Sequence, residues 1–269
     1  DVLRLIFKPA WSDIPQPPEV LAACERIRRH LGTLVDSHLD NPEAFDDIAS
    51  SVIAARDQET GEPFSREELI DQLGVFFLAG HETTASALTW AFYILADQPH
   101  WLARLREEIA TVVGDAPMSF EHTRQLPLTK AFFKETLRLY PPITFMPRVA
   151  LREASVGGRR LRKGALVMIA PWTLQRHSKW WPDPHAFKPE RFLPEQEATL
   201  VQGAYIPFGQ GPHTCVGAGF AQTESVLILA ELVRRFDWLL EPGQTVRPAA
   251  RMTTRPADQV MLHVRPPAA

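Results

Sequence analysis

Long hydrophobic runs are missing from this chain of 269 residues. Its longest apolar stretches begin at Leu73 and Ala165 and cover eight residues each, whereas a helix that crosses a bilayer needs about 18 or more. We therefore expect no membrane span.

Cysteine is nearly absent as well. Cys24 and Cys215 are the only two, and most of the chain lies between them. This count excludes a disulfide framework and favours a reducing compartment, with the cytoplasm as the default location.

An excess of positive charge is also lacking. The chain has 29 Lys and Arg residues against 32 Asp and Glu residues, which gives a formal net charge of −3. It therefore offers no basic field to nucleic acid or to an anionic membrane surface, and we expect no nucleic-acid partner.

Proline, in contrast, is abundant: 24 residues, of which fifteen follow Tyr140. Because proline interrupts helices and central strands, the front half can hold long helices, while the back half is cut into loops, short strands and a few helices. The sequence therefore predicts a mainly α protein with a small β region.

The predicted elements form one domain over residues 1–269. Apolar periodicity and end signals predict surface helices over 19–39 and 41–57, a long central helix over about 65–97, a helix over about 127–140, a β region over about 144–172 and a last long helix over about 218–236. The central helix opens with Ser65 and Glu68 at the spacing of a capping box. Its middle is apolar all round, which predicts burial at the centre of the protein.

A Gly-rich loop at 208–217 carries the clearest chemical signal. It lacks the lysine of a phosphate-binding loop and places Cys215 where a helix begins. The helix end and the N–H groups near Gly209, Gly211 and Gly217 favour a thiolate there, as a metal ligand or a nucleophile requires. Cys24 instead falls on the apolar face of a helix, which predicts an inert buried thiol.

Two further patterns are ambiguous on their own. Gly80 interrupts the central helix and is followed by Glu82 and Thr83; either something approaches this turn closely, or the helix is kinked and Glu82 reaches a neighbouring arginine. Glu135 and Arg138 are spaced i, i+3 on one helix face, which alone indicates a surface ion pair of little energetic weight.

The combination is far more specific. AGHETT, the ExxR of KETLRLYPP, PERF and FxxGxxxCxG, in this order and at these separations, resemble the cytochrome P450 family of haem-thiolate monooxygenases. The resemblance runs from the helix around Ala22 to the tail and implies the C-terminal portion of that fold. Together with a start at Asp1 rather than Met, it leads us to expect a portion of a longer protein. Expressed alone, this portion should leave one side of the central helix between Leu73 and Trp90 uncovered, retain haem poorly and self-associate.

The resemblance implies haem b as cofactor, with Cys215 as the axial thiolate ligand of its iron. Glu135, Arg138 and Arg191 are implied to form a buried ion triad beneath the haem. Phe208 would pack beside the sulfur, and His213 and Arg148 would donate to the haem propionates. The full set of implied haem-binding residues is Cys215, His213, Arg148, Phe208, Gly209, Gly217, Ala79 and Gly80.

The implied reaction inserts one oxygen atom of O₂ into an apolar substrate. Glu82 and Thr83 match the acid and alcohol that deliver protons, and substrate contacts would include Ala79, Ile143, Thr144 and Phe145. The chain has no flavin or iron–sulfur motif, so electrons from NAD(P)H would come through a separate ferredoxin or flavoprotein.

Two alternatives remain open. One is a non-catalytic haem-binding or partner-binding remnant of the same fold. The other is a zinc protein that uses Cys215 and His213, although two ligands so close together give poor tetrahedral geometry.

Overall fold

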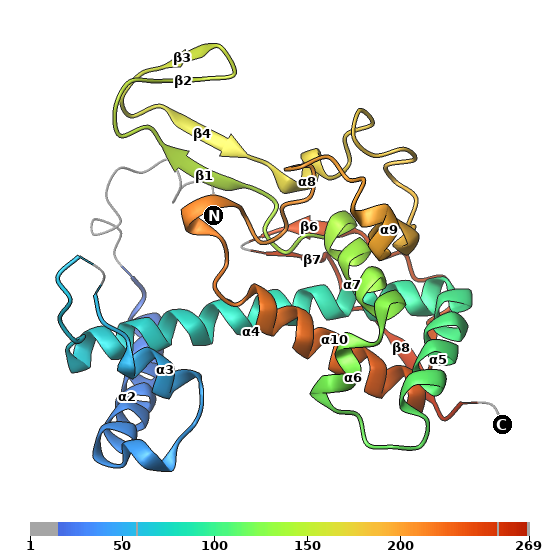
Figure 1. Ribbon diagram of the computed structural model, residues 1–269, viewed down its shortest axis with the longest axis horizontal. Helices are drawn as coiled ribbons and strands as arrows, with labels where there is room; N and C mark the ends of the chain where they lie inside the picture. The colour runs from blue at the N-terminus through green and yellow to red at the C-terminus, as the bar shows by residue number, and fades with distance from the viewer. Residues whose placement is uncertain (1–15, 58, 252, 268–269) are drawn as a thin grey trace. The chain divides into compact units, whose positions relative to one another are not determined.

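The computed structural model describes residues 16–57, 59–251 and 253–267 (Figure 1). Most elements are helices, and the described strands form small two-stranded sheets, which confirms the predicted fold class. The chain divides into two compact units, the N-terminal unit up to His81 and the C-terminal unit from Glu82 onward. The division falls inside the long helix α4 (Arg66–Asp97).

The N-terminal unit is built from helices. It contains α2 (Pro18–Asp40), the short 3₁₀ helix η2 (Pro42–Ala44), α3 (Ile48–Ala54) and the first half of α4. α4 begins with the predicted capping box: the N–H of Ser65 donates to the Glu68 carboxylate at 2.7 Å, and the N–H of Glu68 donates to the Ser65 hydroxyl at 3.4 Å. The small core of this unit consists of Val35, Ala49, Leu69, Ile70 and Leu73.

The prediction of one continuous helix over 41–57 is wrong. The chain leaves η2 at Phe45, whose ring stacks on that of His38 with centroids 3.9 Å apart. Asp47 then caps α3 by accepting a hydrogen bond from the N–H of Ser50 at 2.9 Å. This aspartate favours a new helix start over continuation of the first, because its side chain competes for helix N–H groups.

One burial prediction in this unit is also wrong, whereas the expected uncovered side of the central helix is present. Cys24 is exposed, because α2 buries only Gly32, Val35 and His38, which lie further along the helix. The middle of α4 is not covered on all sides: Val75, Phe77 and Leu78 are 62%, 55% and 60% exposed. The described residues therefore provide no packing partner for this face of α4.

The C-terminal unit has a helical core. The second half of α4 packs with α5 (Pro99–Val113), α7 (Pro127–Leu139) and α10 (Ala218–Arg235), and the short helix α6 (Phe120–Arg124) lies against α10 (Figure 1). Leu95, Leu105, Leu126, Phe132 and Leu229 are fully buried at its centre. Within the described residues, no helix has the length and the apolar character needed to cross a membrane.

The strands of this unit form short antiparallel pairs. The described pairs are β1 (Met146–Val149) with β4 (Leu166–Ile169), β2 (Ala154–Val156) with β3 (Arg159–Leu161), β5 (Asp237–Leu240) with β8 (Leu262–Arg265), and β6 (Pro248–Ala250) with β7 (Thr254–Pro256). In Figure 1 the β2–β3 hairpin projects beyond the β1–β4 sheet, away from α7 and α10. The remaining short helices are α8 (Pro171–Leu174), η3 (Pro189–Phe192), α9 (Pro194–Glu197) and η4 (Gly211–His213).

A buried ion network joins α7 to the segment that follows α8. Glu135 and Arg138 are both 0% exposed and form two hydrogen bonds of 2.7 Å, so the surface interpretation of this pair is wrong. Arg191 of η3 lies 3.5 Å from the same carboxylate. Burial raises the pKa of Glu135, and the hydrogen bond and charge of Arg138 act in the opposite direction.

The remaining donors of Arg138 are also satisfied. Its guanidinium donates to the carbonyl oxygens of Gln175 and Pro184 at 2.8 Å and of Ala186 at 3.0 Å. The Gln175 amide in turn donates to the carbonyl oxygen of Arg138 at 3.0 Å and accepts from the N–H of Ile206 at 3.0 Å. The end of α7 is thereby linked to the chain just before the Gly-rich loop.

We predict that Arg138→Met lowers the free energy of unfolding by about 3–5 kcal/mol, because it leaves the Glu135 carboxylate buried without its cation. Arg160→Met is the control: its partner Glu153 lies at the same 2.7 Å, but the two side chains are 77% and 60% exposed, so the loss should be about 1 kcal/mol or less. Urea unfolding followed by tryptophan fluorescence measures both. Equal losses would contradict a structural role for the buried network.

Candidate functional site

The Gly-rich loop at 208–217 folds back on itself. The N–H of Cys215 donates to the carbonyl oxygen of Phe208 at 2.8 Å, and the Phe208 ring packs against the helical core. Gly209 and Gly211 have φ angles of 77° and 79°, in the left-handed region that residues with a Cβ avoid. A Cβ on Gly209 would also come within 3.4 Å of the His213 carbonyl oxygen. The glycines therefore allow the chain to bring Cys215 back beside Phe208.

Cys215 is exposed where helix α10 begins. The cysteine is free, and its carbonyl oxygen accepts from the N–H of Ala218, the first residue of α10, at 3.3 Å. A Cβ added to Gly217 would lie 3.9 Å from the Cys215 sulfur. A helix start favours a thiolate because its N–H groups lack partners within the helix. Cys215 therefore leaves its sulfur accessible to a group from outside the protein chain.

The donor set suits a metal that needs one protein ligand. In the part of the chain that the structure describes, no group of three or more His, Cys, Asp or Glu side chains could hold a metal ion. A zinc site takes three or four such ligands, so the zinc alternative lacks its ligands among these residues. One thiolate is enough for iron that arrives with four nitrogen ligands in a haem macrocycle. The residues present therefore fit haem.

Apolar side chains are exposed beside the thiol. Val216, the next residue, is 82% exposed, and Phe220 in the first turn of α10 is 60% exposed. Exposed apolar side chains that gather in one place indicate a binding surface. This surface suits a large apolar disc.

The two side chains expected to bind haem carboxylates lie near this loop. His213 is exposed in η4, two positions before Cys215. The sulfur of Met146 on β1 lies 3.5 Å from the Cβ position of Gly209, which places β1 beside the loop. Because side chains two apart on a strand share a face, Arg148 lies on the same face of β1 as Met146. Among the described residues, neither His213 nor Arg148 forms an ion pair.

The expected acid and alcohol are adjacent in α4. Glu82 and Thr83 are both half-buried, and Glu82 Oε1 accepts a hydrogen bond of 2.7 Å from the hydroxyl of Thr253. The sequence left open whether Glu82 reaches an arginine; its partner is instead a threonine 171 positions away. Thr253 lies in a tail without periodicity, so no sequence signal indicated it.

Ala79 and Gly80 belong to the N-terminal unit, and both are exposed. Beyond the backbone of its own helix, a Cβ on Gly80 would meet no described atom within 4 Å. The close approach expected at this glycine is therefore not made by any described residue. Contact of these two residues with haem stays a prediction.

The loop expected to contact substrate lies between α7 and β1. Ile143, Thr144 and Phe145 are half-buried, and the carbonyl oxygen of Thr144 accepts from the N–H of Trp172 at 3.3 Å. The carbonyl oxygen of Pro142, just before this loop, accepts from the N–H of Thr254 at 2.7 Å. The loop is thus tied to both α8 and the β6–β7 hairpin.

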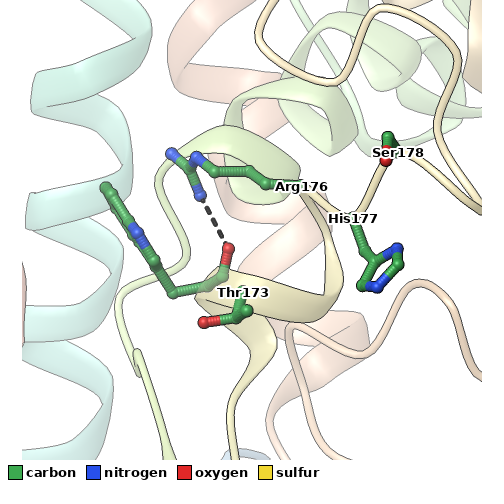
Figure 2. A pocket seen from close by; sticks show the side chains of 5 residues that line it. Thr173, Arg176, His177 and Ser178 are labelled. Atoms are coloured by element: carbon green, nitrogen blue, oxygen red, sulfur yellow. Dashed lines mark hydrogen bonds between the residues drawn. The ribbon is translucent and has the colours of Figure 1, made fainter.

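A pocket also opens at α8, but its polar groups do not converge. Figure 2 shows the Arg176 side chain pointing away from His177 and Ser178. The guanidinium lies 3.5 Å over the Trp172 ring and donates to the carbonyl oxygens of Trp172, at 3.2 Å, and Leu139. Burial lowers the pKa of Arg176 to about 10. Because its donors already bind the backbone, we assign no ligand to this pocket.

Comparison with known proteins agrees with this arrangement. The family model described as Cytochrome P450 matches residues 18–265. Cyclooctatin synthase of Streptomyces melanosporofaciens is 38% identical over 228 residues, which are 83% of this chain and 50% of that protein. Pentalenene oxygenase of Streptomyces avermitilis is 36% identical over 208 residues, 77% of this chain and 46% of that protein. The chain thus spans about half the length of these curated relatives.

Solved structures give the same result. The retinoic acid-bound cyanobacterial CYP120A1 is similar with a TM-score of 0.87 and 29% identity, covering 94% of this chain and 59% of that one. The crystal structure of the cytochrome P450 CYP102L1 is similar with a TM-score of 0.84 and 29% identity, covering 93% and 57%. This chain belongs to the cytochrome P450 family.

Proposed function

We propose that this chain carries the catalytic centre of a haem-thiolate monooxygenase that inserts one oxygen atom of O₂ into an apolar organic substrate. The observation that carries the proposal is the free, exposed Cys215 at the start of α10, held by a loop in which Gly209 and Gly211 have positive φ angles. Haem b is the proposed cofactor. When bound, haem would supply the iron for O₂ activation, and a thiolate ligand donates to that iron the electron density that favours O–O bond cleavage.

The chain's own residues would bind and orient this group. Cys215 would be the iron ligand, and the apolar Val216 and Phe220 would cover part of the macrocycle. Arg148 and His213 would donate to its carboxylates, which are anionic at neutral pH. Gly209 and Gly217 would leave room for the flat ring, where a larger side chain would collide with it.

Proton delivery would depend on α4. The Glu82 carboxylate would take up a proton and pass it on, and the hydroxyl of Thr83, the next residue, would relay it into the site. Ala79 and Gly80, one turn earlier, are small and would leave space for O₂ and substrate. Ile143, Thr144 and Phe145 would line the approach of the substrate.

The substrate class and electron source are supported by relatives. Pentalenene oxygenase and Cyclooctat-9-en-7-ol 5-monooxygenase carry names that specify largely hydrocarbon substrates, in agreement with an apolar substrate. The Bifunctional cytochrome P450/NADPH--P450 reductase of Gibberella moniliformis is 34% identical over 87% of this chain and 21% of that protein, which supports NADPH as the electron source. A separate ferredoxin or flavoprotein would deliver the electrons, in the cytoplasm.

A second candidate is a non-catalytic haem-binding or partner-binding form of the fold. The exposed apolar face of α4 at Val75, Phe77 and Leu78 favours it, because such a face suits a partner. The absorption spectrum of the reduced carbon monoxide adduct separates the candidates. A thiolate-shifted Soret band supports the monooxygenase, and an imidazole-like band or no haem band supports the alternative.

We predict that Cys215→Ser abolishes the thiolate-shifted band and oxygenation, because a serine hydroxyl does not replace the thiolate. Cys24→Ser is the matched control, since Cys24 is also free and exposed, and it should leave both unchanged. Spectra of the reduced carbon monoxide adducts measure the difference. If the two substitutions have equal effects, Cys215 is not the ligand.

We predict that Thr83→Ala retains haem and substrate binding but lowers product formed per NAD(P)H by about tenfold or more, because a positioned proton donor is lost. The diverted electrons should appear as hydrogen peroxide. Thr89→Ala is the control: its hydroxyl lies on the same helix but donates to the carbonyl oxygen of Ala85 at 2.8 Å. Unchanged coupling in Thr83→Ala would argue against its role.

A further inference from the structure

The carboxylate of Glu82 is held from outside its own helix. The hydroxyl of Thr253 donates to Glu82 Oε1 at 2.7 Å, a usual length for an O–H···O hydrogen bond. Thr253 is only 3% exposed, so water does not compete readily for this hydroxyl. Within the described residues, no basic side chain forms an ion pair with Glu82.

The backbone next to Thr253 is fixed to α4 and to the loop before β1. The carbonyl oxygen of Thr254 accepts hydrogen bonds from the Ser86 hydroxyl and from the Trp90 indole N–H, the latter at 3.2 Å. The N–H of Thr254 donates to the carbonyl oxygen of Pro142 at 2.7 Å. These bonds hold the start of β7 in place, and Thr253 immediately precedes it.

We propose that Thr253 is a positioning residue for proton delivery: its hydroxyl keeps the Glu82 carboxylate in one orientation. A glutamate has three rotatable side-chain bonds, and fixing them costs conformational entropy. A buried donor on a fixed hairpin orders the Glu82 side chain in advance, so that this entropy is lost during folding and not during the reaction. The proposal rests on the proposed role of Glu82 as the acid.

The same geometry connects the acid to the proposed substrate loop. Thr253 binds Glu82, while the adjacent Thr254 binds Pro142, which directly precedes Ile143. A substrate that displaces this loop would shift the Thr253 hydroxyl relative to Glu82. Proton delivery would therefore respond to the fit of the substrate.

The test compares variants of Thr253 with a matched neighbour in the full chain. Thr253→Val keeps the side-chain shape but removes the donor, and Thr253→Ser keeps the donor. Thr254→Val is the control, because Thr254 is 1% exposed and its hydroxyl has no hydrogen-bond partner among the described residues. Thr253→Ala removes the same donor and is measured in parallel, in case the valine variant does not fold.

The first measurement needs no turnover. The infrared carboxylate band of Glu82 is obtained as the difference between each protein and its Glu82→Gln counterpart. We expect this band to shift in Thr253→Val and Thr253→Ala, and to stay in place in Thr253→Ser and Thr254→Val. An unshifted band in both variants that lack the hydroxyl would overturn the proposal.

The second measurement is product formed per NAD(P)H in the haem-bound protein. We expect about a tenfold fall in Thr253→Val, the size expected for one lost hydrogen bond to a charged acceptor, with KM unchanged and coupling restored in Thr253→Ser. Unchanged coupling in Thr253→Val, or full coupling in Glu82→Gln, would overturn the functional role.

Failure of the proposed function itself has a different signature. Absence of a thiolate-shifted carbon monoxide band in the unsubstituted protein would contradict the proposed function, and the infrared result would still decide whether Thr253 holds Glu82.

Discussion

The bidentate pair of Glu135 and Arg138 is the interaction on which the rest of the C-terminal unit depends. Arg138 uses its remaining donors on the carbonyl oxygens of Gln175, Pro184 and Ala186, and the Gln175 side chain reaches Ile206. A buried ion pair contributes stability only when its other hydrogen-bonding groups are satisfied. Here the hydrogen bonds of Arg138 and Gln175 fix loop segments that have no helix or sheet hydrogen bonds of their own. The last of these segments leads directly into the cysteine loop.

The reactive groups of the proposed site lie on two elements, the loop before α10 and helix α4. The thiol stands at the start of α10, on a loop closed by the Cys215–Phe208 backbone hydrogen bond. The acid stands on α4 and is held by Thr253 of the C-terminal tail. Each polar group is thus oriented by the backbone of a neighbouring element, which is how binding sites reach fixed geometry without adding buried unpaired charges.

Local signals predicted the local features of this molecule. The Ser65–Glu68 capping box and the glycines around Cys215 depend on residues a few positions apart, and both could be derived from the sequence. The Gln175 and Thr253 contacts could not, because they join residues 31 and 171 positions apart across the tertiary structure. The burial of Glu135 and Arg138 followed only from family resemblance, because an i, i+3 pair looks the same on a surface helix. The exposed face in the middle of α4 was expected only from the family resemblance, because apolar composition shows that a helix needs a packing partner but not whether one is present.

The central claim is that Cys215 supplies the one protein ligand of a haem iron. The most direct test is X-ray absorption at the iron edge of the haem-bound protein, which counts sulfur atoms bonded to iron. We expect one sulfur neighbour in the first coordination shell. A first shell of nitrogen and oxygen alone would contradict it.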